Sequence, residues 1–199
     1  MTSAIFLDRD GVINRKPLEG DYVTSWGDFH ILPGVAEAVA LLNRAGFGVI
    51  VVTNQRCIAK GLISAAGVED LHRNMTDFLA SAGARIDGIY YCPHEIGSAC
   101  DCRKPAPGML LDAARMRGID LTASWMIGDS DVDIEAGRNA GCKTARLLAR
   151  NDSVDGSAPT SESSAGADIT ATSLLDAVRR ILFQEGLAAT ASAKVSASI

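Results

Sequence analysis

Short apolar runs alternate along the chain with longer segments in which apolar positions recur every three or four residues. The short runs, rich in branched and aromatic side chains, predict buried strands at Ala4–Leu7, Gly48–Thr53, Gly88–Tyr91, Ser124–Ile127 and Lys143–Leu147. The longer segments predict helices at Gly34–Ala45, Ala65–Ser81, Gly108–Arg117, Asp131–Ala140 and about Ser173–Gln184. Because strands that alternate with helices are typical of α/β folds, we predict a Rossmann-like parallel sheet with helices on both faces.

Composition narrows the class of protein. At 199 residues and 47% hydrophobic content, the chain can bury one core, and we expect a single domain over residues 1–185 followed by a flexible tail at 186–199. Residues 151–167 are rich in Ser, Gly and Asp and are expected to form a loop. The net charge of -5 disfavours binding to nucleic acid or to anionic membranes. With no signal sequence and no apolar run near the length of about 20 residues that spans a bilayer, we expect a cytoplasmic monomer.

Two pairs of metal-ligand residues lie close together, each with one residue between its members. The pairs are Cys92 with His94 and Cys100 with Cys102. Thiolates and imidazole are ligands of tetrahedral Zn²⁺, and four protein ligands make a structural site. A disulfide is the alternative, and a reducing compartment disfavours it. We therefore predict a structural zinc site in a loop that leads directly into Arg103 and Lys104.

Acidic and small polar residues follow three of the predicted strands. Asp8 and Asp10 follow the first strand, Thr53 ends the second, and Asp129 follows the strand that ends at Ile127. Because ligands of parallel α/β sheets bind beyond the carboxyl ends of the strands, we expect these side chains to converge. Each motif alone could be a helix cap or a solvated turn. Their coincidence favours a site for Mg²⁺, which prefers oxygen ligands.

These motifs resemble those of the haloacid dehalogenase superfamily of phosphotransferases. Asp-x-Asp-Gly-Val at residues 8–12, a threonine, a lysine and Gly-Asp-Ser-x-x-Asp at 128–133 occur in that order. Within the superfamily, Phe-Leu-Asp-Arg-Asp-Gly-Val-Ile-Asn, Val-Thr-Asn-Gln and the Cys/His pairs are similar to those of the heptose bisphosphate and histidinol phosphate phosphatases. The resemblance covers roughly residues 5–147. The segments between the motifs are too short for a separate cap domain, which implies a capless enzyme with an open site.

The resemblance implies a role for each matching residue. Asp8 is implied as the nucleophile that forms an aspartyl-phosphate, and Asp10 as the general acid and base. Thr53 and Lys104 would stabilise the phosphoryl oxygens. Mg²⁺ would be held by the side chains of Asp8 and Asp129 and by the backbone carbonyl of Asp10.

Other residues near the motifs are expected to support them or to be structural. We expect Asp133 to orient its neighbours. Cys57 has no histidine near it in sequence and is expected to pack in the core. His30 and His72 match no motif, so they are interpreted as structural or surface residues.

A doubly phosphorylated substrate needs local positive charge and hydrogen-bond donors. The candidate substrate-binding residues are Asn54, Gln55, Arg56 and Arg103, with Arg15, Lys16 and Lys60 near the same rim. The resemblance implies removal of the C7 phosphate from a phosphorylated sugar, D-glycero-D-manno-heptose 1,7-bisphosphate, and the short loop between the Cys/His pairs favours the α anomer. Histidinol phosphate phosphatase is the alternative enzyme. A catalytically inactive, zinc-stabilised binding module is the alternative of another class, which the unbroken catalytic motifs disfavour.

Overall fold

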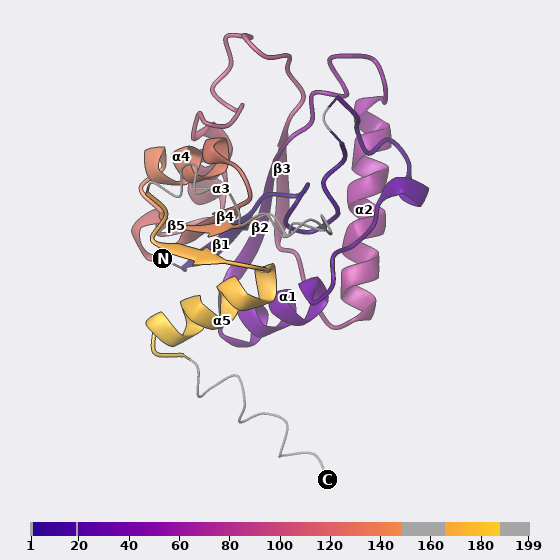
Figure 1. Ribbon diagram of the computed structural model, residues 1–199. Coiled ribbons are helices and arrows are strands. Elements are labelled where there is room, and N and C mark those ends of the chain that lie inside the picture. The colour runs from indigo at the N-terminus through magenta and orange to yellow at the C-terminus, as the bar shows by residue number, and fades with distance from the viewer. Residues whose placement is uncertain (1, 19, 149–165, 188–199) are drawn as a thin grey trace, which may run out of the picture.

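The structure is a computed structural model that describes residues 2–18, 20–148 and 166–187. Within them, six parallel strands form one sheet in the order β3-β2-β1-β4-β5-β6 (Figure 1). The strands are β1 (Ala4–Leu7), β2 (Gly48–Asn54), β3 (Gly88–Cys92), β4 (Trp125–Gly128), β5 (Lys143–Leu147) and β6 (Ile169–Ala171). The five predicted strands are confirmed, with ends that differ by one residue at most. The short edge strand β6 was not predicted.

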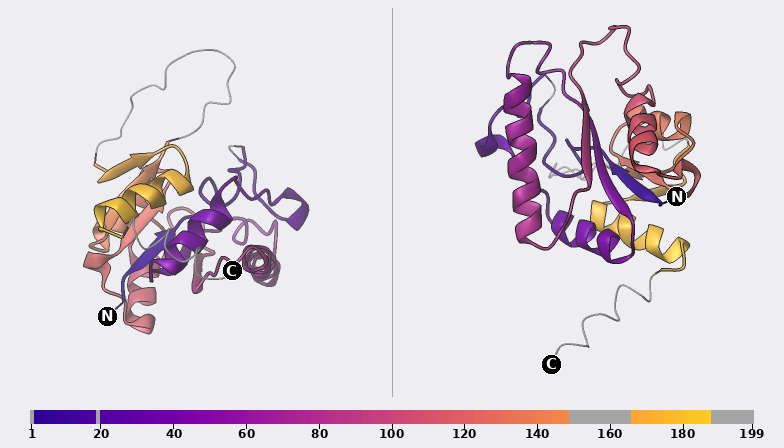
Figure 2. Two further views of the ribbon diagram at one scale, coloured as in Figure 1. Left: turned by 90° about the horizontal axis from the view of Figure 1, so that it is seen from below. Right: turned by 180° about the vertical axis from the view of Figure 1, so that it is seen from behind.

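Helices cover both faces of the sheet, as predicted (Figure 2). Helices α1, α2 and α5 pack on one face through the larger apolar cluster, and α3 and α4 pack on the other. The described helices are α1 (Val35–Arg44), α2 (Ala65–Ser81), α3 (Gly108–Arg117), α4 (Asp131–Asn139) and α5 (Leu174–Gln184), with 3₁₀ turns η1 (Trp26–Asp28) and η2 (Leu121–Ala123). The expected tail falls mostly at 188–199 and the expected loop mostly at 151–165, which lie outside the described residues.

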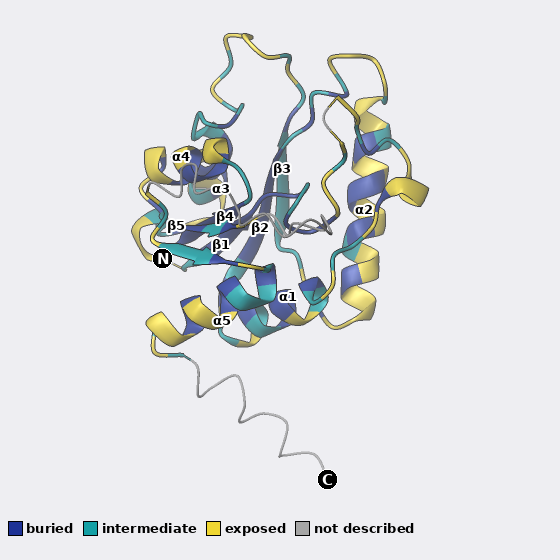
Figure 3. Ribbon diagram, in the orientation of Figure 1, coloured by how far each residue is buried: buried dark blue, intermediate teal, exposed yellow. Residues whose placement is uncertain are grey.

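The central strands β1, β2 and β4 are buried on both faces, because successive side chains point to opposite sides of a sheet that helices cover on each side. The edge strands β3 and β6 are mostly half-buried. In β1, Ile5 and Leu7 join the cluster beneath α1, α2 and α5, whereas Ala4 and Phe6 join the cluster beneath α3 and α4. Figure 3 shows the buried central strands between helices whose outer surfaces are exposed. This two-sided packing fixes the carboxyl ends of the strands, where the predicted site lies.

Local sequence explains the helix ends next to the site. Ser64 begins α2 because its hydroxyl accepts a hydrogen bond from the Gly67 amide at 3.0 Å. Ser130 and Asp133 form a reciprocal capping box at the start of α4. Between β1 and β2 the described residues form an irregular loop, η1 and α1, and a loop and α2 lie between β2 and β3, so these stretches contain no separate cap domain. Among the residues described, no helix has the length and apolar character of a membrane span.

Candidate active site

A buried lysine links two carboxylates where β1, β2 and β4 end. Lys104 is 4% exposed, and its Nζ atom lies 2.7 Å from Asp8 Oδ1 and 2.6 Å from Asp133 Oδ1. It also donates a hydrogen bond to the Val52 carbonyl at 2.8 Å. A buried charge is tolerated only when it is paired and hydrogen-bonded, and Lys104 satisfies both conditions.

Burial and charge act against each other on this cluster. Burial raises the pKa of Asp8 to about 7, and the charges of Asp133 and Asp10 act in the same direction while Lys104 lowers it. Burial works to lower the pKa of Lys104, but the two carboxylates outweigh it and raise that pKa above its ordinary value. The ammonium group therefore stays charged, and Asp8 depends on nearby cations for its ionised form.

Three carboxylates lie close enough to share a cation. One oxygen from each of Asp8, Asp129 and Asp133 falls within 4.8 Å of the others. Asp133 is already engaged, because its carboxylate pairs with Lys104 and accepts hydrogen bonds from the Ser130 hydroxyl at 2.5 Å and amide at 3.1 Å. Both carboxylate oxygens of Asp133 are thus engaged, whereas Asp8 pairs with Lys104 through Oδ1.

Asp129 forms an ion pair with Lys16, a residue that the sequence placed only near the rim of the site. The Lys16 ammonium lies 2.6 Å from Asp129 Oδ2, although 57% of the Lys16 side chain is exposed. Burial raises the pKa of Asp129, and Lys16 works in the opposite direction. Because the Lys16 side chain is largely exposed, this ion pair contributes little energy.

The Asp10 carboxylate points into a separate hydrogen-bond network. The buried Gln55 amide donates to Asp10 Oδ2 at 3.3 Å and to the Thr53 hydroxyl at 2.9 Å, and Asn14 donates to Asp10 Oδ1 at 2.8 Å. The structure therefore brings the predicted residues Asp8, Asp10, Thr53 and Lys104 to one edge of the sheet. Gln55 makes contacts inside the site that sequence analysis did not foresee.

The remaining substrate-binding candidates lie around this centre. Asn54 holds the Lys104 backbone in place, since its side chain accepts from the Lys104 amide at 3.1 Å and donates to the Lys104 carbonyl at 3.2 Å. Arg56 forms an ion pair with Glu95, and Arg103 donates to the His94 carbonyl at 3.1 Å. Both guanidinium groups are thus tied to the loop that follows β3.

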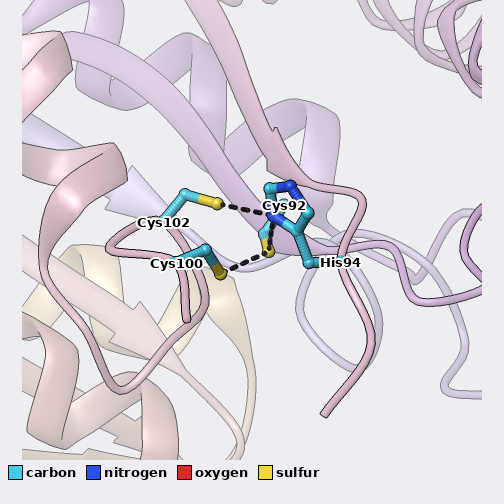
Figure 4. A group of neighbouring side chains, drawn as sticks. All are labelled: Cys92, His94, Cys100 and Cys102. Carbon is cyan, nitrogen blue, oxygen red and sulfur yellow. Dashed lines mark hydrogen bonds between the residues drawn. The ribbon is translucent and has the colours of Figure 1, made fainter. Parts of the chain in front are cut away.

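The four predicted zinc ligands converge (Figure 4). Cys92 Sγ lies 3.5 Å from His94 Nδ1 and 3.9 Å from Cys100 Sγ, and His94 Nδ1 lies 3.2 Å from Cys102 Sγ. Tetrahedral Zn²⁺ with its usual bond lengths separates its ligand atoms by about 3.5–3.8 Å. The donor set and its spacing therefore fit a zinc ion, and the cluster joins the end of β3 to the loop just before Lys104.

Two glycines leave room for carboxylates of the site. Gly11 has a φ of +94°, and a Cβ atom there would clash with the Asp129 carboxylate. A Cβ atom at Gly128 would clash with the side chain of Asp133. Gly11 thus lets the loop after β1 approach Asp129, whereas Gly128 lets the chain after β4 fold back so that Asp133 packs against the strand end.

Comparisons with known proteins agree with this geometry. Residues 101–177 match the HAD-hydrolase-like family model. The D-glycero-beta-D-manno-heptose-1,7-bisphosphate 7-phosphatase of Rhodopseudomonas palustris is 45% identical over 69% of this chain and 79% of its own length. The enzyme of that name from Escherichia coli K12 is 41% identical over 92% of this chain and 95% of its own length. The chain belongs to the heptose-1,7-bisphosphate 7-phosphatase family.

A crystal structure also falls within the heptose-bisphosphate phosphatase family. The D,D-heptose 1,7-bisphosphate phosphatase of B. bronchiseptica, complexed with magnesium and phosphate, is 33% identical with a TM-score of 0.79, over 92% of this chain and 99% of that chain. The predicted superfamily and phosphatase class are confirmed. The curated relatives of this family carry the β anomer in their names, whereas the loop length favoured the α anomer.

The structure also shows polar residues of this phosphatase fold that sequence analysis did not place. Arg9 and His72 are both buried and lie in contact behind Asp10. His72 is thus a buried structural residue and His30 is exposed, while Cys57 packs in the interior, where burial raises the pKa of its thiol. The burial of Arg9 and His72 could not be read from sequence, because their contact joins the loop after β1 to a residue of α2 that lies 63 positions away.

Proposed function

We propose that this chain removes the C7 phosphate of D-glycero-β-D-manno-heptose 1,7-bisphosphate through an aspartyl-phosphate on Asp8. The names of the relatives support the substrate and the β anomer. The observation that carries the chemistry is the buried Asp8 carboxylate, which lies 2.7 Å from the Lys104 ammonium with Asp129 beside it. A carboxylate facing fixed positive charge is suited to attack phosphorus.

Asp8 and Asp10 are proposed to act in two successive steps. In the first, Asp8 attacks phosphorus, the bond from phosphorus to the C7 oxygen breaks, and Asp10 gives its proton to that oxygen. In the second, Asp10 takes a proton from water as the water oxygen attacks phosphorus and the bond to Asp8 breaks. Thr53 and Lys104 donate to the phosphoryl oxygens, whose negative charge would otherwise repel the nucleophile.

Asp8, Asp129 and the backbone carbonyl of Asp10 are proposed to hold Mg²⁺. The close approach of the Asp8 and Asp129 carboxylates fits a cation with oxygen ligands. Bound there, Mg²⁺ supplies positive charge that draws nucleophile and phosphate together. The four-residue Cys/His cluster is proposed to hold a structural Zn²⁺ ion, which would fix the loop that carries Arg103 and Lys104.

Polar and cationic side chains around the site are proposed to bind the bisphosphate. A cavity of about 290 Å³ lies among the residues after β1, where Arg15 and Lys16 are balanced by Asp21 and Asp28 in its lining. Arg56 and Arg103 lie on the loop side, and with Asn54 and Gln55 they complete the proposed binding set. We further propose that residues 1–185 act as one domain, because the groups named here lie at the carboxyl ends of strands of one sheet. The protein is proposed to be a cytoplasmic monomer.

A turnover panel tests the proposal. The purified chain is assayed for phosphate release from both anomers of the heptose bisphosphate and from histidinol phosphate, with and without Mg²⁺. We expect Mg²⁺-dependent release and the highest kcat/KM for the β anomer. Preference for histidinol phosphate or for the α anomer would overturn the substrate assignment. Absence of release from any monoester would favour a binding module instead.

A further inference from the structure

The side chain of Arg9 is buried beneath the active site. Its residue is 1% exposed, yet it carries a guanidinium, a group that almost always remains charged. Burying such a group is unfavourable unless its hydrogen bonds are satisfied, and an apolar side chain of similar volume would often be as stable or more so. The contacts of Arg9 therefore indicate which role its buried positive charge serves.

One edge of this guanidinium faces Asp10. Arg9 Nη2 donates to Asp10 Oδ1 at 3.1 Å and to Oδ2 at 3.0 Å, and Arg9 Nε lies 3.3 Å from Oδ1. With Asn14 on Oδ1 and Gln55 on Oδ2, the carboxylate is held from three sides. A planar fork that reaches both oxygens fixes the plane of the carboxylate as well as its distance.

The rest of the guanidinium is held by two other parts of the fold. Arg9 Nη1 lies 3.2 Å from Nε2 of His72, a buried residue of α2. Since arginine has no acceptor, this His72 nitrogen must accept, and its ring carries the proton on Nδ1. The Phe29 ring covers one face of the guanidinium, with its centroid 5.5 Å from Arg9 Cζ. Arg9, in the loop after β1, is thus fixed by the segment before α1 and by α2.

We propose that Arg9, held in place by His72, is the positioning residue that sets the carboxyl of Asp10 at the leaving-group oxygen. The inference rests on the proposed function of Asp10 as general acid and base, and it adds how that group is aimed. Arg9 and His72 touch neither substrate nor metal in this scheme. They act through Asp10, whose effectiveness depends on its placement within a fraction of an ångström.

Leaving-group dependence separates positioning from a merely structural role. A sugar alkoxide is a poor leaving group that needs a proton from Asp10, whereas p-nitrophenolate leaves without one. The assay measures kcat/KM for heptose 1,7-bisphosphate and for p-nitrophenyl phosphate. For Arg9→Met we expect a fall of about 10- to 100-fold with the sugar and of less than about threefold with the aryl ester.

His72 variants extend the test from Arg9 to its support. His72→Phe keeps a ring but removes the acceptor, and it should lower kcat/KM for the sugar several-fold with little effect on the aryl ester. His72→Gln restores an acceptor and should recover most of the loss. Arg73→Gln, at an exposed position of α2 paired only with Asp70, is the matched control and should leave both substrates unchanged.

The outcomes separate this inference from the proposed function. Wild-type protein and Asp10→Asn are run in the same assay. Wild-type turnover of the sugar, with a loss confined to the sugar in Asp10→Asn, establishes the acid role. If Arg9→Met and His72→Phe then lose activity equally on both substrates, or lose none, positioning by Arg9 is refuted. If Arg9→Met does not fold, Arg9→Lys is assayed instead, because it keeps the positive charge but cannot reach both oxygens of Asp10 as a guanidinium does. The loss of kcat/KM on the sugar relative to that on the aryl ester then decides.

Discussion

The buried imidazole of His72 makes folding stability depend on pH. Burial, together with the nearby Arg9 charge, lowers the pKa of His72 from 6.5 to about 3. In the unfolded chain the ring returns to an ordinary pKa and binds a proton below about pH 6.5. The unfolded state then holds more protons than the folded state, so stability rises with pH through the window from about 3 to 6.5 and is lost as pH falls.

The magnitude follows from the two pKa values. Between pH 7 and pH 5 the unfolded state gains about 2 kcal/mol from protonation of His72, while the folded state gains almost nothing. For a chain of this length, that change corresponds to a fall in Tm of about 4–8 °C. His72→Gln removes the titrating ring and keeps an acceptor for Arg9, so it should abolish this part of the slope.

Thermal or urea unfolding at pH 5, 6 and 7 measures the effect. The quantity of interest is the change in the free energy of unfolding between pH 7 and pH 5, compared between wild type and His72→Gln, because carboxylates titrate alike in both proteins. His30→Gln is the matched control, since His30 is exposed and its loss should leave the slope as in wild type. Parallel curves for wild type and His72→Gln would show that His72 is not held neutral.

Three further predictions address the chemistry and the metal sites. Asp8→Asn should abolish turnover with the fold retained, and a residual kcat of one tenth, a barrier change of only about 1.4 kcal/mol, would exclude Asp8 as the nucleophile. Lys104→Met leaves Asp8 and Asp133 buried without their shared cation, so we expect a loss of about 3–5 kcal/mol in unfolding free energy and at least about a 100-fold fall in kcat; normal stability and turnover would contradict the ion-pair assignment. Cys102→Ser should release the zinc, as measured by metal analysis, and lower kcat/KM while calorimetry still detects Mg²⁺ binding. Loss of Mg²⁺ binding in this variant would contradict the prediction that the zinc loop only positions Arg103 and Lys104.

Most of the fold could be predicted because helix caps and the spacing of apolar residues are local features of the sequence. The ends of α2 were predicted correctly since Ser64 caps one end and the apolar spacing stops at the other. The strand β6, by contrast, has only three residues, Ile169–Ala171, which show no alternation to detect. Its place at the sheet edge comes from pairing with β5, a non-local contact.

The candidate site was predictable to the extent that its residues follow strands. Asp8, Thr53 and Asp129 converge because parallel strands end at one edge. Pairings between side chains on different loops could not be predicted, since they depend on rotamers and on packing. The sequence indicated Arg56 only as a substrate-binding residue, yet its guanidinium forms an ion pair with Glu95 from another loop. The Lys16 contact with Asp129 likewise joins residues 113 positions apart.

The glycines at positions 11 and 128 determine how freely this enzyme can vary. Neither has a functional group, yet any side chain at Gly11 would push against Asp129, and any at Gly128 would push against Asp133. Tolerance to substitution near the site is therefore set by space as well as by chemistry. Conservative changes such as glycine to alanine, usually chosen as harmless in protein engineering, would here displace a carboxylate. A redesign of substrate preference has more freedom in the cavity-lining loop after β1, where Leu18 is largely exposed.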